Sequence, residues 1–299
     1  MTASIRDVEV AVGVRAQLGE GPIWDPAAQC LYFVDILRGH LHHFDPRAPA
    51  DRALTTYEVG QPVGAVALTD ADDLLLAVRD GFARFDARTG AMRMIAHVER
   101  ERTDCRMNDG AVDAAGRFWA GTMALDERAC AGSLYRLDPD GRVYTMVTDV
   151  TVSNGIDWSD DGSRMYYVDS PARSIDVFEF DLASGTVADR RTLVRIEREH
   201  GFPDGLTVDA EGFIWVALWR GSAVHRYTPE GQLDAVVRLP VTHPTSCAFG
   251  GPDLTDLYIT SATIPLSQAE LAQQPLGGHV LRVRAGVPGR PPHRFKGRM

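Results

Sequence analysis

HGFPDGLTVDAEGFIWVALWRGSAVHRYTPEG, residues 200–231, contains one copy of a pattern that repeats along this chain. A short strand opens at Leu206 after the turn Pro-Asp-Gly, and a second strand rich in Trp, Val and Leu follows the turn at Glu211-Gly212. A further alternating strand then ends at Glu230-Gly231. Two-residue periodicity between Gly- and Pro-containing turns is typical of antiparallel β-strands.

The same pattern recurs at a spacing of roughly 40 to 50 residues, which is the length of a four-stranded propeller blade. Six copies are found, with their second-strand signals at residues 30–46, 73–90, 116–141, 164–185, 212–231 and 256–286. No composition break or Pro/Ser-rich linker divides the chain, and only residues 267–274 suggest a turn of helix. We expect an all-β, six-bladed β-propeller with four-stranded antiparallel blades, forming a single domain over residues 1–299.

Composition excludes several classes of function. The formal net charge is −10, which disfavours nucleic-acid binding, and the basic tail at 293–299 is too short to reverse it. The start of the chain does not resemble a signal peptide, and no apolar stretch approaches 18 residues, so we expect a cytoplasmic protein with no membrane partner. The four cysteines form no CxxC pair, which argues against a disulfide framework or a zinc knuckle. A closed propeller has short edges, so we expect a monomer.

The first strands of the six copies carry the candidate site. In four of them an oxygen-bearing residue stands directly before a glycine: Glu20, Asp109, Asn154 and Asp204. Innermost strands line the central channel of a propeller, so three or four of these side chains should converge. Carboxylates brought together there would repel one another and lose hydration, unless they share a divalent cation. The alternative is that Pro203-Asp204-Gly205 is only a turn.

The residues also resemble a known family. GEGPIW (19–24), RMNDGAVDAAGRFWAGTM (106–123), SNGIDW (153–158), PDGLTVDAEGFIWVAL (203–218) and TSCAFGG (245–251) are similar, in this order, to motifs of the SMP-30/gluconolactonase/regucalcin family. The resemblance covers essentially the whole chain. It implies a six-bladed propeller that acts as a metal-dependent sugar lactonase, with one divalent ion.

Carried over by this resemblance, Glu20, Asn154 and Asp204 match the metal ligands, and Arg106 and Asn108 match positions that contact the lactone. A further acidic contact follows the GTM motif in relatives close to regucalcin. Asp126 stands at that spacing, in a loop a few residues shorter.

The expected reaction is the hydrolysis of an aldono-1,4- or 1,5-lactone to its aldonic acid. Asp204 is the candidate general base and proton donor, and Arg106 and Asn108 supply hydrogen-bond donors. No GxSxG elbow is present, and Cys105 has no histidine nearby in sequence. Two other functions stay open: hydrolysis of organophosphate esters or fluorides, and calcium binding without turnover. The sequence leaves the lactone undefined and does not choose among Ca, Zn, Mn, Mg and Fe.

Overall fold

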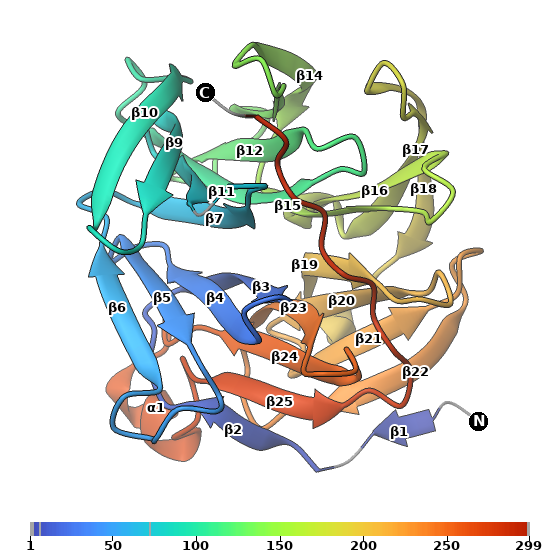
Figure 1. Ribbon diagram of the computed structural model, residues 1–299. Helices are drawn as coiled ribbons and strands as arrows, with labels where there is room; N and C mark the ends of the chain where they lie inside the picture. Colours follow the sequence, from blue (N-terminus) through green and yellow to red (C-terminus); the bar gives the residue numbers. More distant parts are fainter. Residues whose placement is uncertain (1–2, 6, 72, 298–299) are drawn as a thin grey trace.

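The computed structural model describes residues 3–5, 7–71 and 73–297. Its strands form six sheets, which Figure 1 shows as blades around a common axis. The first strands of neighbouring blades contact one another in a closed ring, so they line the axis. The all-β, six-bladed propeller expected from the repeat is confirmed.

The first four blades each consist of four consecutive antiparallel strands, counted here from the axis outward. They are β3 (Gly19–Asp25), β4 (Cys30–Asp35), β5 (His40–Phe44) and β6 (Leu54–Glu58); β7 (Val63–Leu68), β8 (Leu74–Val78), β9 (Gly81–Asp86) and β10 (Ala91–His97); β11 (Cys105–Val112), β12 (Phe118–Ala124), β13 (Gly132–Leu137) and β14 (Val143–Val150); and β15 (Ser153–Trp158), β16 (Arg164–Asp169), β17 (Ser174–Asp181) and β18 (Thr186–Arg195).

The last two blades use the two ends of the chain. The fifth has β19 (Phe202–Val208), β20 (Ile214–Trp219), β21 (Ala223–Tyr227) and β22 (Leu233–Arg238), and β1 (Ala3–Ile5) pairs with β22 in parallel. The sixth has β23 (Pro244–Gly250), β24 (Asp256–Ser261) and β25 (Val280–Arg284), and its outer strand is β2 (Glu9–Val12). The N-terminal segment therefore closes the ring, a feature that the repeat pattern did not predict.

Every blade has an irregularity at the same level of its innermost strand. The pairing of the first strand with the second shifts register at Glu20/Ile23, Val63/Ala65, Met107/Gly110, Ser153/Ile156, Pro203/Leu206 and Pro244/Cys247. A β-bulge turns the side chains beside it away from the regular alternation. The six bulges explain how the residues before the repeated glycines come to point at the axis.

Two of the repeated glycines of the inner strands are needed because neighbouring inner strands approach closely. A Cβ added to Gly155 would lie 2.6 Å from the backbone nitrogen of Leu206, and one added to Gly205 would lie 2.1 Å from Ser246 Oγ. Any larger residue would push β15, β19 and β23 apart. Gly155 and Gly205 thus set the spacing of the inner strands in the fourth, fifth and sixth blades.

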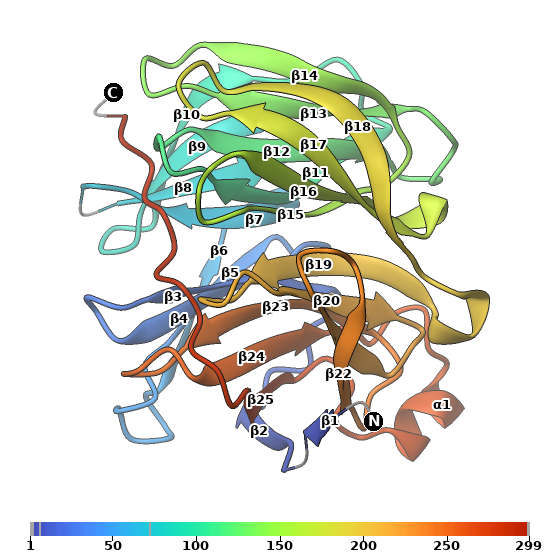
Figure 2. The same ribbon diagram turned by 90° about the vertical axis from the view of Figure 1, so that its right-hand side faces the viewer.

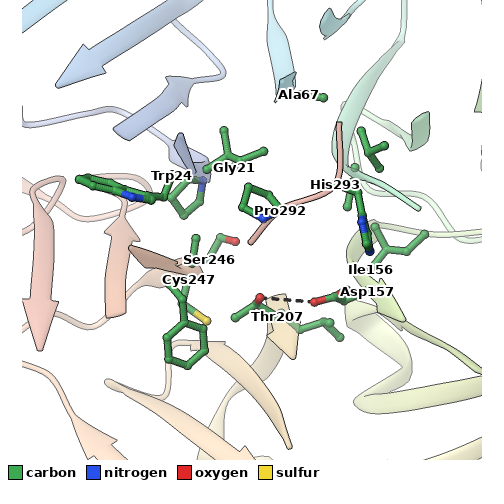
Figure 3. A pocket seen from close by; sticks show the side chains of 18 of the residues that line it. Gly21, Trp24, Ala67, Ile156, Asp157, Thr207, Ser246, Cys247, Pro292 and His293 are labelled. Atoms are coloured by element: carbon green, nitrogen blue, oxygen red, sulfur yellow. Dashed lines mark hydrogen bonds between the residues drawn. The ribbon is translucent and has the colours of Figure 1, made fainter. Parts of the chain in front are cut away.

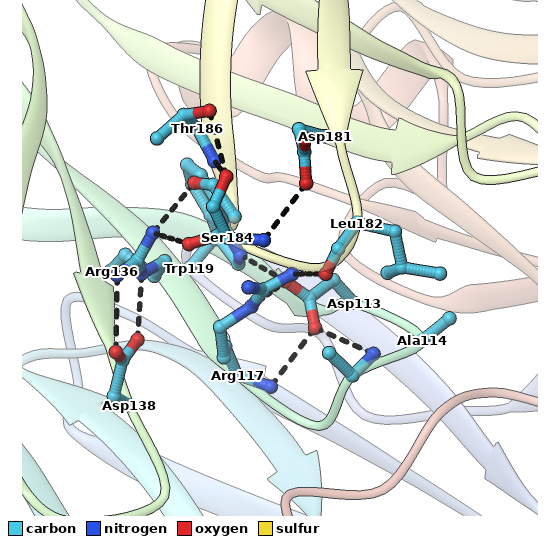
Figure 4. Close-up of polar contacts among 12 residues, drawn as sticks. Asp113, Ala114, Arg117, Trp119, Arg136, Asp138, Asp181, Leu182, Ser184 and Thr186 are labelled. Carbon is cyan, nitrogen blue, oxygen red and sulfur yellow. Dashed lines mark hydrogen bonds and ion pairs between the residues drawn. The ribbon is translucent and has the colours of Figure 1, made fainter.

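The blades are joined by buried polar contacts as well as by apolar packing. Asp113 accepts hydrogen bonds from Trp119 Nε1 and Arg117 Nε, and Asp209 accepts one from Trp215 Nε1 in the fifth blade. Arg117 and Arg136 also donate to carbonyl oxygens of the β17–β18 turn, at Leu182, Ser184 and Gly185 (Figure 4). The bonds of Arg117 and Arg136 to this turn attach the third blade to the fourth, whereas those of Asp113 and Asp209 lie within single blades.

The C-terminal segment, residues 290–297, runs across one face of the propeller, and we call it the strap (Figures 1 and 2). Phe295 is fully buried and forms a bridge with Thr69, and Arg294 pairs with Asp25 at 2.6 Å. Arg290 pairs with Asp157 and donates to the carbonyl oxygen of Trp158. Lys296 N donates to the carbonyl oxygen of Gly116 in the third blade, and Arg290 Nε donates to that of Val208 in the fifth. The strap therefore contacts the first five blades.

The short helix suggested by the sequence is confirmed as α1 (Gln268–Gln273), which begins with a capping box between Ser267 and Glu270. Two 3-10 turns, η1 (Ser170–Ala172) and η2 (Arg198–His200), follow β16 and precede β19. No helix in the described part of the chain is long and apolar enough to cross a membrane.

Candidate functional site

Six polar side chains meet around the axis near the start of the inner strands, and we call them the polar cluster. All are buried, and they come from four blades: Glu20 on β3, Arg106, Asn108 and Asp109 on β11, Asn154 on β15 and Asp204 on β19. Asn108 Nδ2 donates to Asn154 Oδ1 at 3.0 Å, and Arg106 Nη1 donates to Asn108 Oδ1. Residues separated by up to 184 positions in sequence are thus brought into one site.

Two carboxylates outside the cluster hold the segments that lead into it. Asp35, at the end of β4, accepts hydrogen bonds from the backbone N–H groups of Gln17 and Leu18, just before Glu20. Asp169, at the end of β16, accepts the equivalent pair from Thr151 and Val152, just before Asn154. The same device therefore fixes the approach to Glu20 and to Asn154.

The two carboxylates at the centre are held in an unfavourable environment. Burial is the largest cause that raises the pKa of Glu20 well above its ordinary value, and the negative charges of Asp204 and Asp109 raise it further. Burial also raises the pKa of Asp204, with the charge of Asp109 next, while the Gly205 N–H and Arg106 oppose the shift. Both groups would be stabilised by a positive charge placed between them.

The other two ionisable groups complete this electrostatic picture. Burial raises the pKa of Asp109 to about 6, although the Gly110 N–H opposes it. Burial lowers the pKa of Arg106 to about 10, against the charges of Glu20, Glu127 and Asp204. One guanidinium thus faces three buried carboxylates, so the cluster lacks positive charge.

The donor set fits a hard divalent cation. Asp204 Oδ1 is buried and has no hydrogen-bond partner within the described residues, which is costly for a carboxylate unless a cation faces it. Glu20 adds a second carboxylate and Asn154 an amide oxygen, and oxygen atoms are the ligands of Ca²⁺, Mg²⁺ and Mn²⁺. No three His, Cys, Asp or Glu residues of the described chain gather closely enough to form a metal site, so an amide would have to complete this set.

Beyond the cluster, the channel continues as a cavity of about 130 Å³. It is lined by residues of all six inner strands, among them Trp24, Ile156, Thr207 and Cys247 (Figure 3). Asp109 belongs both to this lining and to the cluster. Pro292 and His293 of the strap also line this cavity (Figure 3). The other strap contacts, to Asp25, Asp157 and Val208, lie near the last residues of the inner strands. The strap thus borders the end of the channel opposite the polar cluster.

The structure brings together five of the six residues named from the sequence: Glu20, Arg106, Asn108, Asn154 and Asp204. It places Asp126 outside the cluster, where the carboxylate is 64% exposed and pairs with Arg128 at 2.9 Å. In the same loop, Glu127 is the residue whose charge acts on Arg106. Asp109 stands directly before a glycine of an inner strand, as Glu20, Asn154 and Asp204 do. It could therefore have been named from the sequence.

The fold and the site together place this protein in one class: six-bladed β-propellers that carry a buried cluster of carboxylate, amide and guanidinium groups on the axis. Within that class, the chain belongs to the SMP-30/gluconolactonase/LRE-like family, whose model matches residues 18–263.

Similar proteins agree with this assignment over nearly the full length. Regucalcin of Gallus gallus is 38% identical, covering 97% of this chain and 98% of its own. A Bacillus subtilis protein, named as a candidate sugar lactone lactonase, is 35% identical and covers 97% of this chain and 99% of its own.

Two solved structures are also similar. One is a luciferin-regenerating enzyme, with a TM-score of 0.90 and 31% identity over 97% of this chain and 99% of that one. The other is a regucalcin of Agrobacterium tumefaciens described as a calcium-binding protein, with a TM-score of 0.93 and 29% identity over 98% of both chains.

Proposed function

We propose that this protein is a divalent-cation-dependent hydrolase that opens a sugar lactone to its aldonic acid. The observation that carries the proposal is Asp204 Oδ1, which is buried, has no hydrogen-bond partner among the described residues, and belongs to a carboxylate close enough to Glu20 to raise its pKa. In this proposal Glu20, Asn154 and Asp204 hold the cation. The relatives named for lactone chemistry and for calcium binding support the two halves of the proposal separately.

When bound, a divalent cation there would polarise the lactone carbonyl and acidify a water molecule. Asp204 accepts the proton of the attacking water through a carboxylate oxygen. The oxygen of that water bonds to the acyl carbon, and the bond between the acyl carbon and the ring oxygen then breaks. Asp204 returns the proton to the ring oxygen, which becomes a hydroxyl of the aldonic acid, and the water oxygen stays in its carboxyl group. Because Asp204 both accepts and returns the proton, it ends the reaction in the protonation state in which it began.

Arg106 supplies the donors that orient the lactone in this proposal, because both Nδ2 protons of Asn108 are already donated, to Ser153 O and to Asn154 Oδ1. Within the described residues the hydrogen bonds of Arg106 start from Nη1, to Met107 O and Asn108 Oδ1, which leaves Nε and Nη2 for the substrate. Asn108 fixes the guanidinium by accepting one of those bonds. A remaining contact comes from the loop after β12, through Asp126 as the family resemblance implies or through its neighbour Glu127.

The experiment is a pH-stat assay of a panel of 1,4- and 1,5-aldonolactones. Metal-stripped protein is compared with protein reconstituted with Ca²⁺, Mg²⁺, Mn²⁺, Zn²⁺ or Fe²⁺, and organophosphate esters serve as the competing substrate class. We expect lactone turnover only with a cation present. Turnover that is equal with and without cations, or restricted to the phosphate esters, contradicts the proposal.

A second candidate function is calcium binding without turnover, which the description of the Agrobacterium relative favours. The same assay separates the two candidates when calorimetry is run in parallel. Calcium binding together with no hydrolysis of any lactone in the panel would favour this second function.

A further inference from the structure

We infer that Ser170 is a positioning residue that fixes the side-chain amide of Asn154 with its oxygen toward the polar cluster. Ser170 is the first residue after β16, in the 3-10 turn η1. Its hydroxyl lies 2.8 Å from Asn154 Nδ2 and 2.7 Å from the carbonyl oxygen of Pro203. It therefore connects the residue before Asp204 with Asn154. The inference rests on the proposed cation site.

The orientation of the amide follows from counting protons. A serine hydroxyl has one proton and two lone pairs, and a backbone carbonyl oxygen can only accept. Ser170 must give its proton to Pro203 O, so it can only accept from Asn154. The Asn154 atom that faces it is then the NH₂ group, and Oδ1 must point the other way. Amide orientation, which is otherwise ambiguous, is settled here by the network.

A second contact requires the same orientation. Asn108 Nδ2 donates to Asn154 Oδ1 at 3.0 Å and also to the carbonyl oxygen of Ser153 at 2.7 Å. A flipped Asn154 would set its NH₂ group against that of Asn108, and its oxygen against the lone pairs of Ser170. Both hydrogen bonds would be lost together, inside a buried site where unpaired polar atoms are costly.

Comparison of the blades shows why a hydroxyl is needed in this blade. The first residue after the second strand is Ile36, Arg79, Leu125, Arg220 or Ala262 in the other five blades. The proposed ligands of blades one and five are carboxylates. Their two oxygens are chemically equivalent, so either oxygen can face the cation. Asn154 is the proposed ligand whose side chain ends in two different groups, an oxygen and an NH₂. The hydroxyl of Ser170 lies in the same blade.

The test is calorimetric titration of Ca²⁺ and Mn²⁺ into the metal-stripped protein. Ser170→Ala should weaken cation binding about tenfold, the equivalent of one net hydrogen bond, while Ser170→Thr should retain most of the affinity. Ser174→Ala is the matched control, because it removes a buried hydroxyl in the same blade that bonds to Asp176 outside the cluster. It should leave the affinity unchanged.

The Asn154→Asp background separates orientation from general loss of structure. A carboxylate at 154 has two equivalent oxygens, so adding Ser170→Ala should then cause no further loss of affinity. Equal affinity in wild-type and Ser170→Ala protein would overturn the role of Ser170 and leave the cation site standing. A tenfold loss that persists in the Asn154→Asp background would also overturn it. Wild-type protein that binds neither cation would overturn both this inference and the proposed function.

Discussion

The two ends of the central channel are built by the same six strands and differ in charge balance: carboxylates gather at one end, whereas Asp157 is paired with Arg290 at the other. At the start of the strands, bulges turn Glu20, Asn154 and Asp204 inward, and the charges there repel one another. Further along, regular pairing resumes, the lining includes Trp24 and Ile156, and the strap lies across the end. In our proposal the first end binds the cation, and its repelled charges lower the stability of the metal-free protein, whereas the packing of the strap at the second end raises stability. Substitutions at the two ends should therefore affect different measurements.

The largest effect is expected at the binding end, from Asp204→Asn. The amide cannot accept the proton of the attacking water, so lactone turnover should fall by on the order of 10² to 10⁴-fold. Because a buried, repelled charge is removed, the metal-free variant should melt at or above the temperature of the wild type. Steady-state kinetics and thermal unfolding check the two halves. Unchanged turnover with the cation still bound would rule out Asp204 as the general base.

At the strap end, Phe295→Ala should mainly reduce stability. Phe295 is fully buried, and truncation of such a side chain costs about 3 to 5 kcal/mol. Denaturant unfolding measures this loss. The cation affinity of the folded variant should stay within twofold of the wild type, because the strap borders the far end of the channel. A large drop in affinity with little change in unfolding would show that the two ends are not independent.

Asp109 stands between the two ends and should give a pH-dependent effect. Its pKa in the folded protein is about 6 rather than 3.8, so the folded state keeps a proton between these values that the unfolded state has lost. Metal-free stability should therefore fall as pH rises from about 4 to 6, by roughly 1.4 kcal/mol for each unit of pKa difference.

Asp109→Asn should remove this part of the pH dependence and stabilise the metal-free protein above pH 6. Urea unfolding at pH 4, 6 and 8 measures it, with Asp126→Asn as an exposed control. A variant that keeps the full wild-type pH slope would contradict the burial argument.

The smallest effect concerns the loop after β12. Glu127→Gln should raise the KM for the lactone several-fold, because the charge of Glu127 acts on Arg106, whereas Asp126→Asn should change KM less. Asp126 forms an exposed ion pair with Arg128, and such pairs contribute about 0 to 1 kcal/mol. A larger effect of Asp126→Asn would favour the contact implied by the family resemblance. Both variants should unfold like the wild type.

The fold could be predicted from the sequence because each blade repeats one local pattern. Trp-, Val- and Leu-rich strands and the glycine after Glu20, Asn154 and Asp204 carry the architecture in their spacing. Closure of the sixth blade by Glu9–Val12 could not be predicted this way, since pairing between the two ends of the chain leaves no local signal. The strap could not be predicted for the same reason, because Phe295 and Arg290 contact residues that are far away in sequence.

The clustering of the candidate residues was predictable where an oxygen-bearing side chain stands directly before a repeated glycine, as for Glu20 and Asp204. It was not predictable where geometry decides. Asp126 has the expected type and spacing, but the loop turns it to solvent. Ser170 carries no sequence signal, because the role that we infer for it depends on two hydrogen bonds, one accepted from Asn154 in its own blade and one donated to Pro203 O in the next.

The most direct measurement is anomalous diffraction from crystals of the protein soaked in Mn²⁺. The account predicts a single strong peak on the propeller axis, within about 2.0 to 2.6 Å of oxygen atoms of Glu20, Asn154 and Asp204. No peak at these three side chains, or a peak bound elsewhere in the channel, would contradict it.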